Sequence, residues 1–71
     1  METKHDRFKR LARLRGERIL NDLRLLGNLA NRNNYEYSDS EVKALFSAID
    51  EELKIARFSF ERNKKRKIEF K

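Results

Sequence analysis

The sequence predicts an all-α protein, an antiparallel hairpin of two helices that dimerises into a four-helix bundle. The chain of 71 residues contains no proline and only two glycines, so few positions oppose a helix. Apolar residues recur at steps of three and four along both halves, which is typical of one face of a helix. A short polar segment separates the halves, and short connections make helices antiparallel neighbours. We therefore expect residues 1–71 to form a single helical-hairpin domain.

The first helix is expected over residues 4–30. Thr3 followed by Asp6 is a weaker form of the capping box that starts many helices. Gly27 is the best competing end, because glycine is favoured just past a helix C-terminus. Ala30 still keeps the helical period, so we expect the helix to continue through it. The face of this helix is formed by Phe8, Ala12, Gly16, Ile19, Leu23, Leu26 and Ala30.

A polar segment over residues 31–37 loses the helical period and forms the predicted turn. It is rich in asparagine, a residue favoured in turns. Asn33 or Asn34 is expected to adopt the left-handed backbone conformation that ends many helices.

A capping box marks the start of the second helix, which is expected over residues 38–64. Ser38 and Glu41 have the spacing at which each side chain binds the backbone N–H of the other residue. Tyr37, just before the cap, is expected to pack against Val42 as a hydrophobic staple. The face of this helix is formed by Val42, Phe46, Ile49, Leu53, Ala56 and Phe60.

The two apolar faces match layer by layer when the chain is folded back at residue 36. Gly16 then lies opposite Ala56, where the absent side chain lets the two backbones approach closely. A glycine inside a helix costs about 1 kcal/mol relative to alanine. The alternative interpretation is that Gly16 is a tolerated defect of the helix.

Six apolar residues lie away from this hairpin seam and need cover. Below about 70–80 residues, a single core rarely stabilises a chain without disulfides or a metal. A second copy of the chain is the simplest cover, because two-fold dimers are the commonest assemblies. The residues of this candidate interface with a second copy or another partner are Leu14, Leu25, Ile55, Phe58, Ile68 and Phe70.

Charge is distributed unevenly along the chain, whose formal net charge is +6. The net charge is +4 over residues 1–24, −4 over residues 25–53 and +6 over residues 54–71, which include a basic tail over residues 62–71. An antiparallel hairpin would gather the first and last segments into one basic pole, which fits a polyanion such as DNA or RNA. The candidate nucleic-acid-binding residues are Arg7, Lys9, Arg10, Arg13, Arg15, Arg18, Arg57, Arg62, Lys64, Lys65, Arg66 and Lys67.

Acidic side chains at helical spacing compete with this interpretation. Residues four apart are neighbours on a helix surface, so opposite charges there can form ion pairs. A helix face of this kind is often no more than solvated. The pairs with this spacing are Arg13 with Glu17, Arg18 with Asp22, Asp50 with Lys54, and Arg57 with Glu61.

Residues that could carry catalysis are sparse. His5 is the one histidine, and the absence of cysteine removes disulfides, thiolate metal ligands and a cysteine nucleophile. There is no glycine-rich phosphate loop, and the serines have too few histidine and aspartate partners for a triad. We expect no enzymatic activity, metal, cofactor or small-molecule substrate. The lack of cysteine fits a reducing, cytoplasmic setting, and no apolar stretch is long enough for a membrane span.

Two classes of function remain. The first is a small nucleic-acid-binding protein of low sequence specificity, because phosphate contacts position a protein without reading bases. The alternative is a protein interaction module, such as an adaptor, inhibitor or regulatory subunit, which completes a helical bundle with a partner protein. Tyr35 and Tyr37 could stack on bases, but the capping signals favour a structural role for both.

Overall fold

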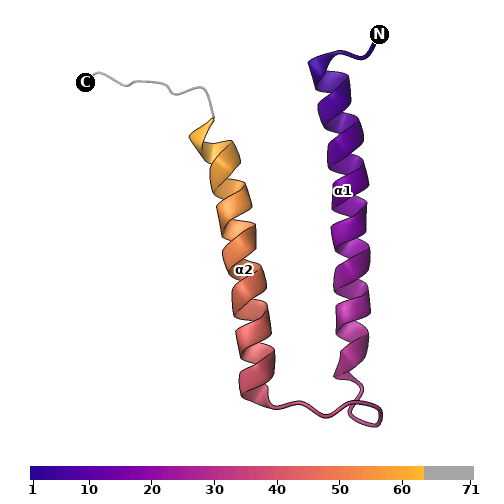
Figure 1. Ribbon diagram of the computed structural model, residues 1–71, viewed down its shortest axis with the longest axis vertical. Helices are drawn as coiled ribbons and strands as arrows, with labels where there is room; N and C mark the ends of the chain where they lie inside the picture. Colours follow the sequence, from indigo (N-terminus) through magenta and orange to yellow (C-terminus); the bar gives the residue numbers. More distant parts are fainter. Residues whose placement is uncertain (64–71) are drawn as a thin grey trace, which may run out of the picture. The chain divides into compact units, whose positions relative to one another are not determined.

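The computed structural model describes residues 1–63 and shows two α-helices (Figure 1). Helix α1 spans Lys4–Gly27, a 3₁₀ turn η1 spans Asn28–Ala30, and α2 spans Asp39–Arg62. No strand occurs among these described residues, so the all-α prediction is confirmed. The chain divides into an amino-terminal unit, Met1–Glu36, and a carboxy-terminal unit, Tyr37–Lys71.

The first turn of α1 is held by the predicted cap. Thr3 has an extended backbone, and its hydroxyl accepts a 2.9 Å hydrogen bond from the N–H of Asp6. The Asp6 carboxylate in turn accepts a hydrogen bond from the N–H of Thr3 at 3.4 Å. Both donors belong to the group that a helix leaves unpaired at its start, so this capping box fixes where α1 begins.

The end of α1 differs from the expectation. The regular α-helix stops at Gly27 and tightens into η1, so the prediction of a continuous α-helix to Ala30 is wrong for its last three residues. The N–H of Asn28 points toward the carbonyls of Arg24, Leu25 and Leu26, as expected where a helix narrows to a 3₁₀ turn.

No left-handed residue follows this helix. None of residues 1–63 has a positive φ, so the prediction for Asn33 or Asn34 is wrong. The Asn31 side chain instead accepts a 2.9 Å hydrogen bond from the N–H of Asn33. The backbone carbonyl of Asn31 accepts hydrogen bonds from the N–H groups of Asn34 and Tyr35, at 3.1 and 3.0 Å. An asparagine that binds its own turn in this way removes the need for a left-handed residue.

The start of α2 follows the sequence closely. The Ser38 hydroxyl accepts from the N–H of Glu41 at 3.1 Å, and the Glu41 carboxylate accepts from the N–H of Ser38 at 2.8 Å. Tyr37 and Val42 are both half-buried and line the same shallow hollow, as the predicted staple requires. The helix ends at Arg62; position 64, where its end was expected, lies outside the described residues.

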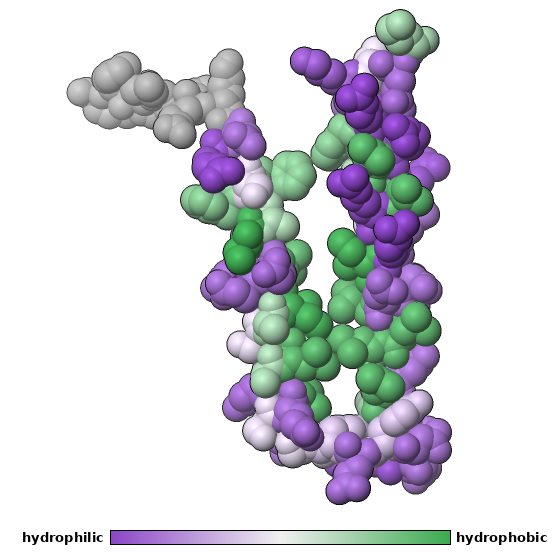
Figure 2. All heavy atoms as spheres, in the orientation of Figure 1, coloured by the Kyte–Doolittle hydropathy of each residue, from purple (hydrophilic) through white to green (hydrophobic). Residues whose placement is uncertain are grey.

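Neither helix buries its apolar face within its own unit. None of residues 1–63 is buried, and the exposed large apolar side chains of α1 and α2 range from 40% exposed at Leu23 to 64% at Phe60. Figure 2 shows hydrophobic side chains gathered along the length of each helix. Within the described part of the chain, neither helix is sufficiently long and apolar to cross a bilayer.

Candidate nucleic-acid interface

Half of the candidate nucleic-acid-binding residues lie on α1. They occupy positions 7–18, a length of about 17 Å at 1.5 Å per residue. Each of their side chains is exposed, so each can reach a ligand in solvent. We refer to this set as the basic run, and its members are Arg7, Lys9, Arg10, Arg13, Arg15 and Arg18.

An ion pair that the sequence did not predict occupies the start of the basic run. Glu2 accepts two hydrogen bonds from Arg10, 2.7 Å to Nε and 3.1 Å to Nη2, in the two-pronged geometry typical of arginine and carboxylate. Arg7 Nε lies 3.9 Å from the same carboxylate. The hydrogen bond that Arg10 donates to Glu2 raises the pKa of Arg10. The only sequence signal was an acidic residue just ahead of an arginine-rich helix.

The rest of the basic run is not neutralised by neighbours. Within the basic run, Arg7 and Arg10 form ion pairs with Glu2. Three of the pairs predicted from helical spacing are not formed among residues 1–63: Arg13 with Glu17, Arg18 with Asp22, and Asp50 with Lys54. The physical reason is that such exposed pairs gain only about 0.3–0.5 kcal/mol, which is too little to hold two long side chains in one geometry. Lys9, Arg13, Arg15 and Arg18 thus present full positive charges to solvent.

The arginines of α1 mostly point away from its main apolar stripe. Successive residues are rotated by about 100° around the helix axis, so Arg7, Arg10 and Arg18 share one side. Leu14 lies among them and is 50% exposed. Arg15 sits at the edge of the apolar stripe. This side of α1 therefore combines cations with an exposed leucine.

The remaining basic candidates belong to the carboxy-terminal unit. Arg57 and Arg62 are exposed in the last two turns of α2. The other four, Lys64, Lys65, Arg66 and Lys67, lie outside the described residues.

The apolar interface candidates are exposed wherever the structure describes them. Leu14 and Leu25 on α1 are 50% and 56% exposed, and Ile55 and Phe58 on α2 are 51% and 61% exposed. Ile55 and Phe58 line a shallow, apolar hollow with the stem of Lys54. Ile68 and Phe70 lie outside the described residues.

Residues with other chemical potential are dispersed. Among residues 1–63, no three histidine or acidic side chains gather as metal ligands would. His5 is exposed in the first turn of α1. Tyr35 is 48% exposed, whereas Tyr37 is half-buried at the cap of α2, which leaves it a poorer platform for stacking on a base.

Comparison with known proteins adds no relative. No family model matches the chain, and neither a curated protein nor a solved structure matches it. The function must therefore be argued from the chemistry of the surface.

Proposed function

We propose that this chain is a small, non-enzymatic nucleic-acid-binding protein that contacts the phosphate backbone of DNA or RNA. The observation that carries the proposal is the basic run of α1. Four of its six cations have no ion pair among the described residues, and all six are exposed. Arginine suits this task because its planar guanidinium binds phosphate oxygens through two parallel hydrogen bonds.

An antiparallel hairpin would enlarge this basic surface. The helices have equal lengths of 24 residues, and eight residues, 31–38, separate η1 from α2. Equal helices joined by a short connection favour folding back on each other. Chain reversal would bring Arg57, Arg62 and the basic residues 64–67 toward the basic run. The hairpin would also cover the main apolar stripes of both helices, and a homodimer of four helices would cover more.

Phosphate binding of this kind should be strong at low salt and nearly indifferent to sequence. Each neutralised phosphate releases condensed counterions, so affinity falls steeply as salt rises. Contacts to phosphate fix the position of a protein on the nucleic acid but do not read its bases. The proposal therefore predicts similar affinities for unrelated sequences of one type of nucleic acid.

Affinity measured across a salt series tests the proposal. Duplex DNA, duplex RNA and single strands of about 20 nucleotides would be titrated with the protein between about 0.05 and 0.3 M salt. We expect micromolar or tighter binding that weakens steeply with salt, and weaker binding with a flatter slope when residues 64–67 are replaced by alanine. Lys43→Ala, in the acidic first half of α2, is the control and should change little. Absent or salt-independent binding would refute the proposal.

The second candidate function is a protein interaction module in the same cytoplasmic setting. Exposed Ile55 and Phe58 favour it, because apolar side chains that share a hollow are typical of docking surfaces. Purification from the native source without nuclease separates the two candidates. A high ratio of absorbance at 260 to 280 nm that high salt removes supports nucleic acid, whereas a stoichiometric companion protein supports the interaction module.

A further inference from the structure

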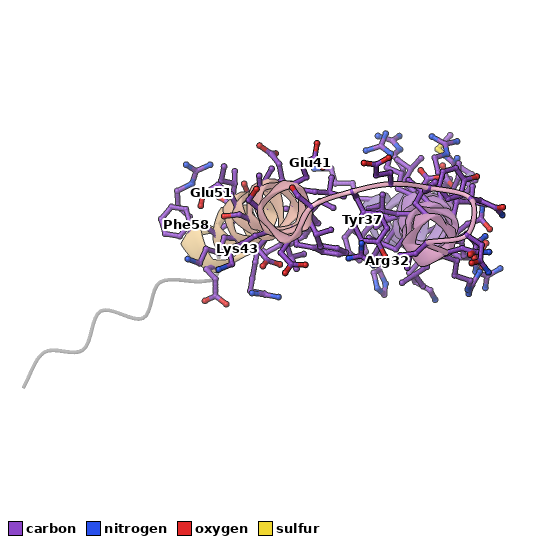
Figure 3. All side chains as sticks on the ribbon, turned by 90° about the horizontal axis from the view of Figure 1, so that it is seen from below. Arg32, Tyr37, Glu41, Lys43, Glu51 and Phe58 are labelled. Atoms are coloured by element: carbon purple, nitrogen blue, oxygen red, sulfur yellow. The ribbon has the colours of Figure 1, made fainter. Side chains whose placement is uncertain are left out.

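A second stripe runs along α2, separate from its main apolar face. Its members recur at steps of four and three, so at about 100° per residue they lie within about 80° of one another. All are exposed, and in Figure 3, which looks along α2, Glu51 and Phe58 project on the same side of the helix. The centre of this stripe lies about 160° from that of the main face. Its residues are Ala44, Ala48, Glu51, Ile55, Phe58 and Arg62.

Side-chain size changes along this second stripe. Ala44 and Ala48 occupy the first half, whereas Ile55 and Phe58 occupy the second half. Two copies of the stripe that pack antiparallel, centred beside Glu51, would place Phe58 of one copy against Ala44 of the other. Ile55 would likewise meet Ala48. Large side chains would then fill the space left by small ones, as well-packed interfaces require.

Charge is complementary in the same register. Arg62, at the end of the stripe, would lie opposite Ser40 of the other copy and beside Glu41, whose carboxylate also accepts from the N–H of Ser38 in its own helix. The two-fold symmetry makes this pairing twice. A parallel arrangement would instead place Arg62 beside Arg62 and Phe58 beside Phe58. Size and charge therefore favour the antiparallel register.

We propose that the second stripe of α2 is the contact between two copies of this chain, packed antiparallel about an axis beside Glu51. This inference identifies the interface of the homodimer that we proposed, and it does not rest on nucleic-acid binding. Because the two faces of α2 point in nearly opposite directions, two hairpins joined here would form a layer with both copies of α2 at its centre. That arrangement would replace the four-helix bundle expected from the sequence.

Glu51 is the one unfavourable member of the stripe, and this makes the proposal testable by a gain of affinity. The two copies of Glu51 would face each other across the axis, and like charges brought together at an interface oppose association. Removing this carboxylate should therefore tighten the dimer. A structural role for Glu51 within its own helix would not produce that result.

Sedimentation equilibrium over a concentration series, without nucleic acid, measures the dimer constant. Glu51→Ala should tighten it at least about fivefold, since like-charge contacts across an interface are costly. Asp50→Ala is the matched control: it removes an adjacent carboxylate that points about 100° away, and it should leave the constant unchanged. Ala48→Glu and Phe58→Ala should each weaken association at least about tenfold. Circular dichroism of each variant confirms that the helices remain folded.

Single cysteines test the antiparallel register, because the natural chain contains none. In the proposed dimer, the two copies of residue 51 meet at the axis, whereas the two copies of residue 44 lie about 21 Å apart along the helices. A short bismaleimide cross-linker should therefore join Glu51→Cys chains efficiently and Ala44→Cys chains poorly. Equal cross-linking at both positions would contradict the antiparallel register.

Two results would overturn the proposal outright. One is a monomer at all concentrations, and the other is a dimer whose constant is the same for Glu51→Ala, Ala48→Glu and Phe58→Ala as for the natural chain. Neither result bears on phosphate binding by α1, which the salt series measures separately. A dimer that tightens with Glu51→Ala but not with Asp50→Ala would support the proposal even if the protein bound no nucleic acid.

Discussion

Replacing Glu2 with glutamine should strengthen nucleic-acid binding, because Glu2 neutralises part of the basic run. Its carboxylate oxygens lie 2.7 and 3.1 Å from Nε and Nη2 of Arg10, and 3.9 Å from Nε of Arg7. A phosphate that binds either arginine must compete with this carboxylate. Glu2→Gln removes one negative charge and so frees one cation for a phosphate.

The size of the effect follows from counterion release. For duplex DNA, the logarithm of the binding constant falls linearly with the logarithm of the salt concentration, and each additional phosphate contact steepens this slope by about 0.9. At 0.1 M salt, such a change in slope corresponds to about eightfold in affinity. We therefore expect Glu2→Gln to tighten binding by up to about eightfold and to steepen the slope by about one. The helix should stay folded, because the pair is solvated, with 57% of Arg10 and 34% of Glu2 exposed, and such pairs contribute little stability.

Fluorescence anisotropy with a labelled duplex across a salt series measures both quantities. Glu36→Gln is the matched control, because it changes the net charge equally. Glu36 follows the opposite end of α1, a helix about 36 Å long, whereas charges in 0.1 M salt are screened beyond about 10 Å. Equal gains for the two variants would show that only total charge matters. A loss of affinity with Glu2→Gln would refute the role given to the basic run.

Three further changes test the cap, the helix glycine and the basic run. Ser38→Ala should lower the free energy of unfolding by about 1 kcal/mol in urea titrations, because it removes the cap of α2, and equal loss from Ser40→Ala would contradict this. Gly16→Ala should stabilise the protein by about 1 kcal/mol, because a Cβ there meets no atom within 4 Å beyond its chain neighbours and the nearby backbone of its own helix; destabilisation would instead indicate a closely packed neighbour. Replacing Arg13 and Arg18 together with glutamine should flatten the salt slope for duplex DNA by about two, and an unchanged slope would exclude both from phosphate contact.

The features that the sequence predicted best are those fixed by neighbours along the chain. The capping boxes at Thr3 and Ser38 each depend on a partner three residues later, so the pattern of residues contains nearly all the geometry. The period of apolar residues likewise depends only on the pitch of a helix. These local rules account for the all-α fold and for the starts of both helices.

The predictions that were wrong concern choices between states of similar free energy. After Gly27, a continued α-helix and a 3₁₀ turn differ only in which carbonyls pair with a few N–H groups. Ala30 keeps the helical spacing of apolar residues, but this spacing does not decide between the two conformations. Exposed ion pairs are equally finely balanced. Arg10 bonds with Glu2, eight residues away, rather than with a neighbour on its own helix, because the extended chain ahead of the cap lets Glu2 approach from outside the helix.

Exposure of both helices links the stability of this protein to its function. Helix caps contribute about 1 kcal/mol each, and most helical stability in proteins comes from packing an apolar face. With none of residues 1–63 buried in its own unit, both helices need cover from each other or from a second copy. The basic run presents its cations at fixed intervals only while α1 is helical, so covering the apolar stripes also preserves the phosphate-binding surface. The proposed dimer contact lies on α2 and the basic run on α1, so one chain can use both surfaces at the same time.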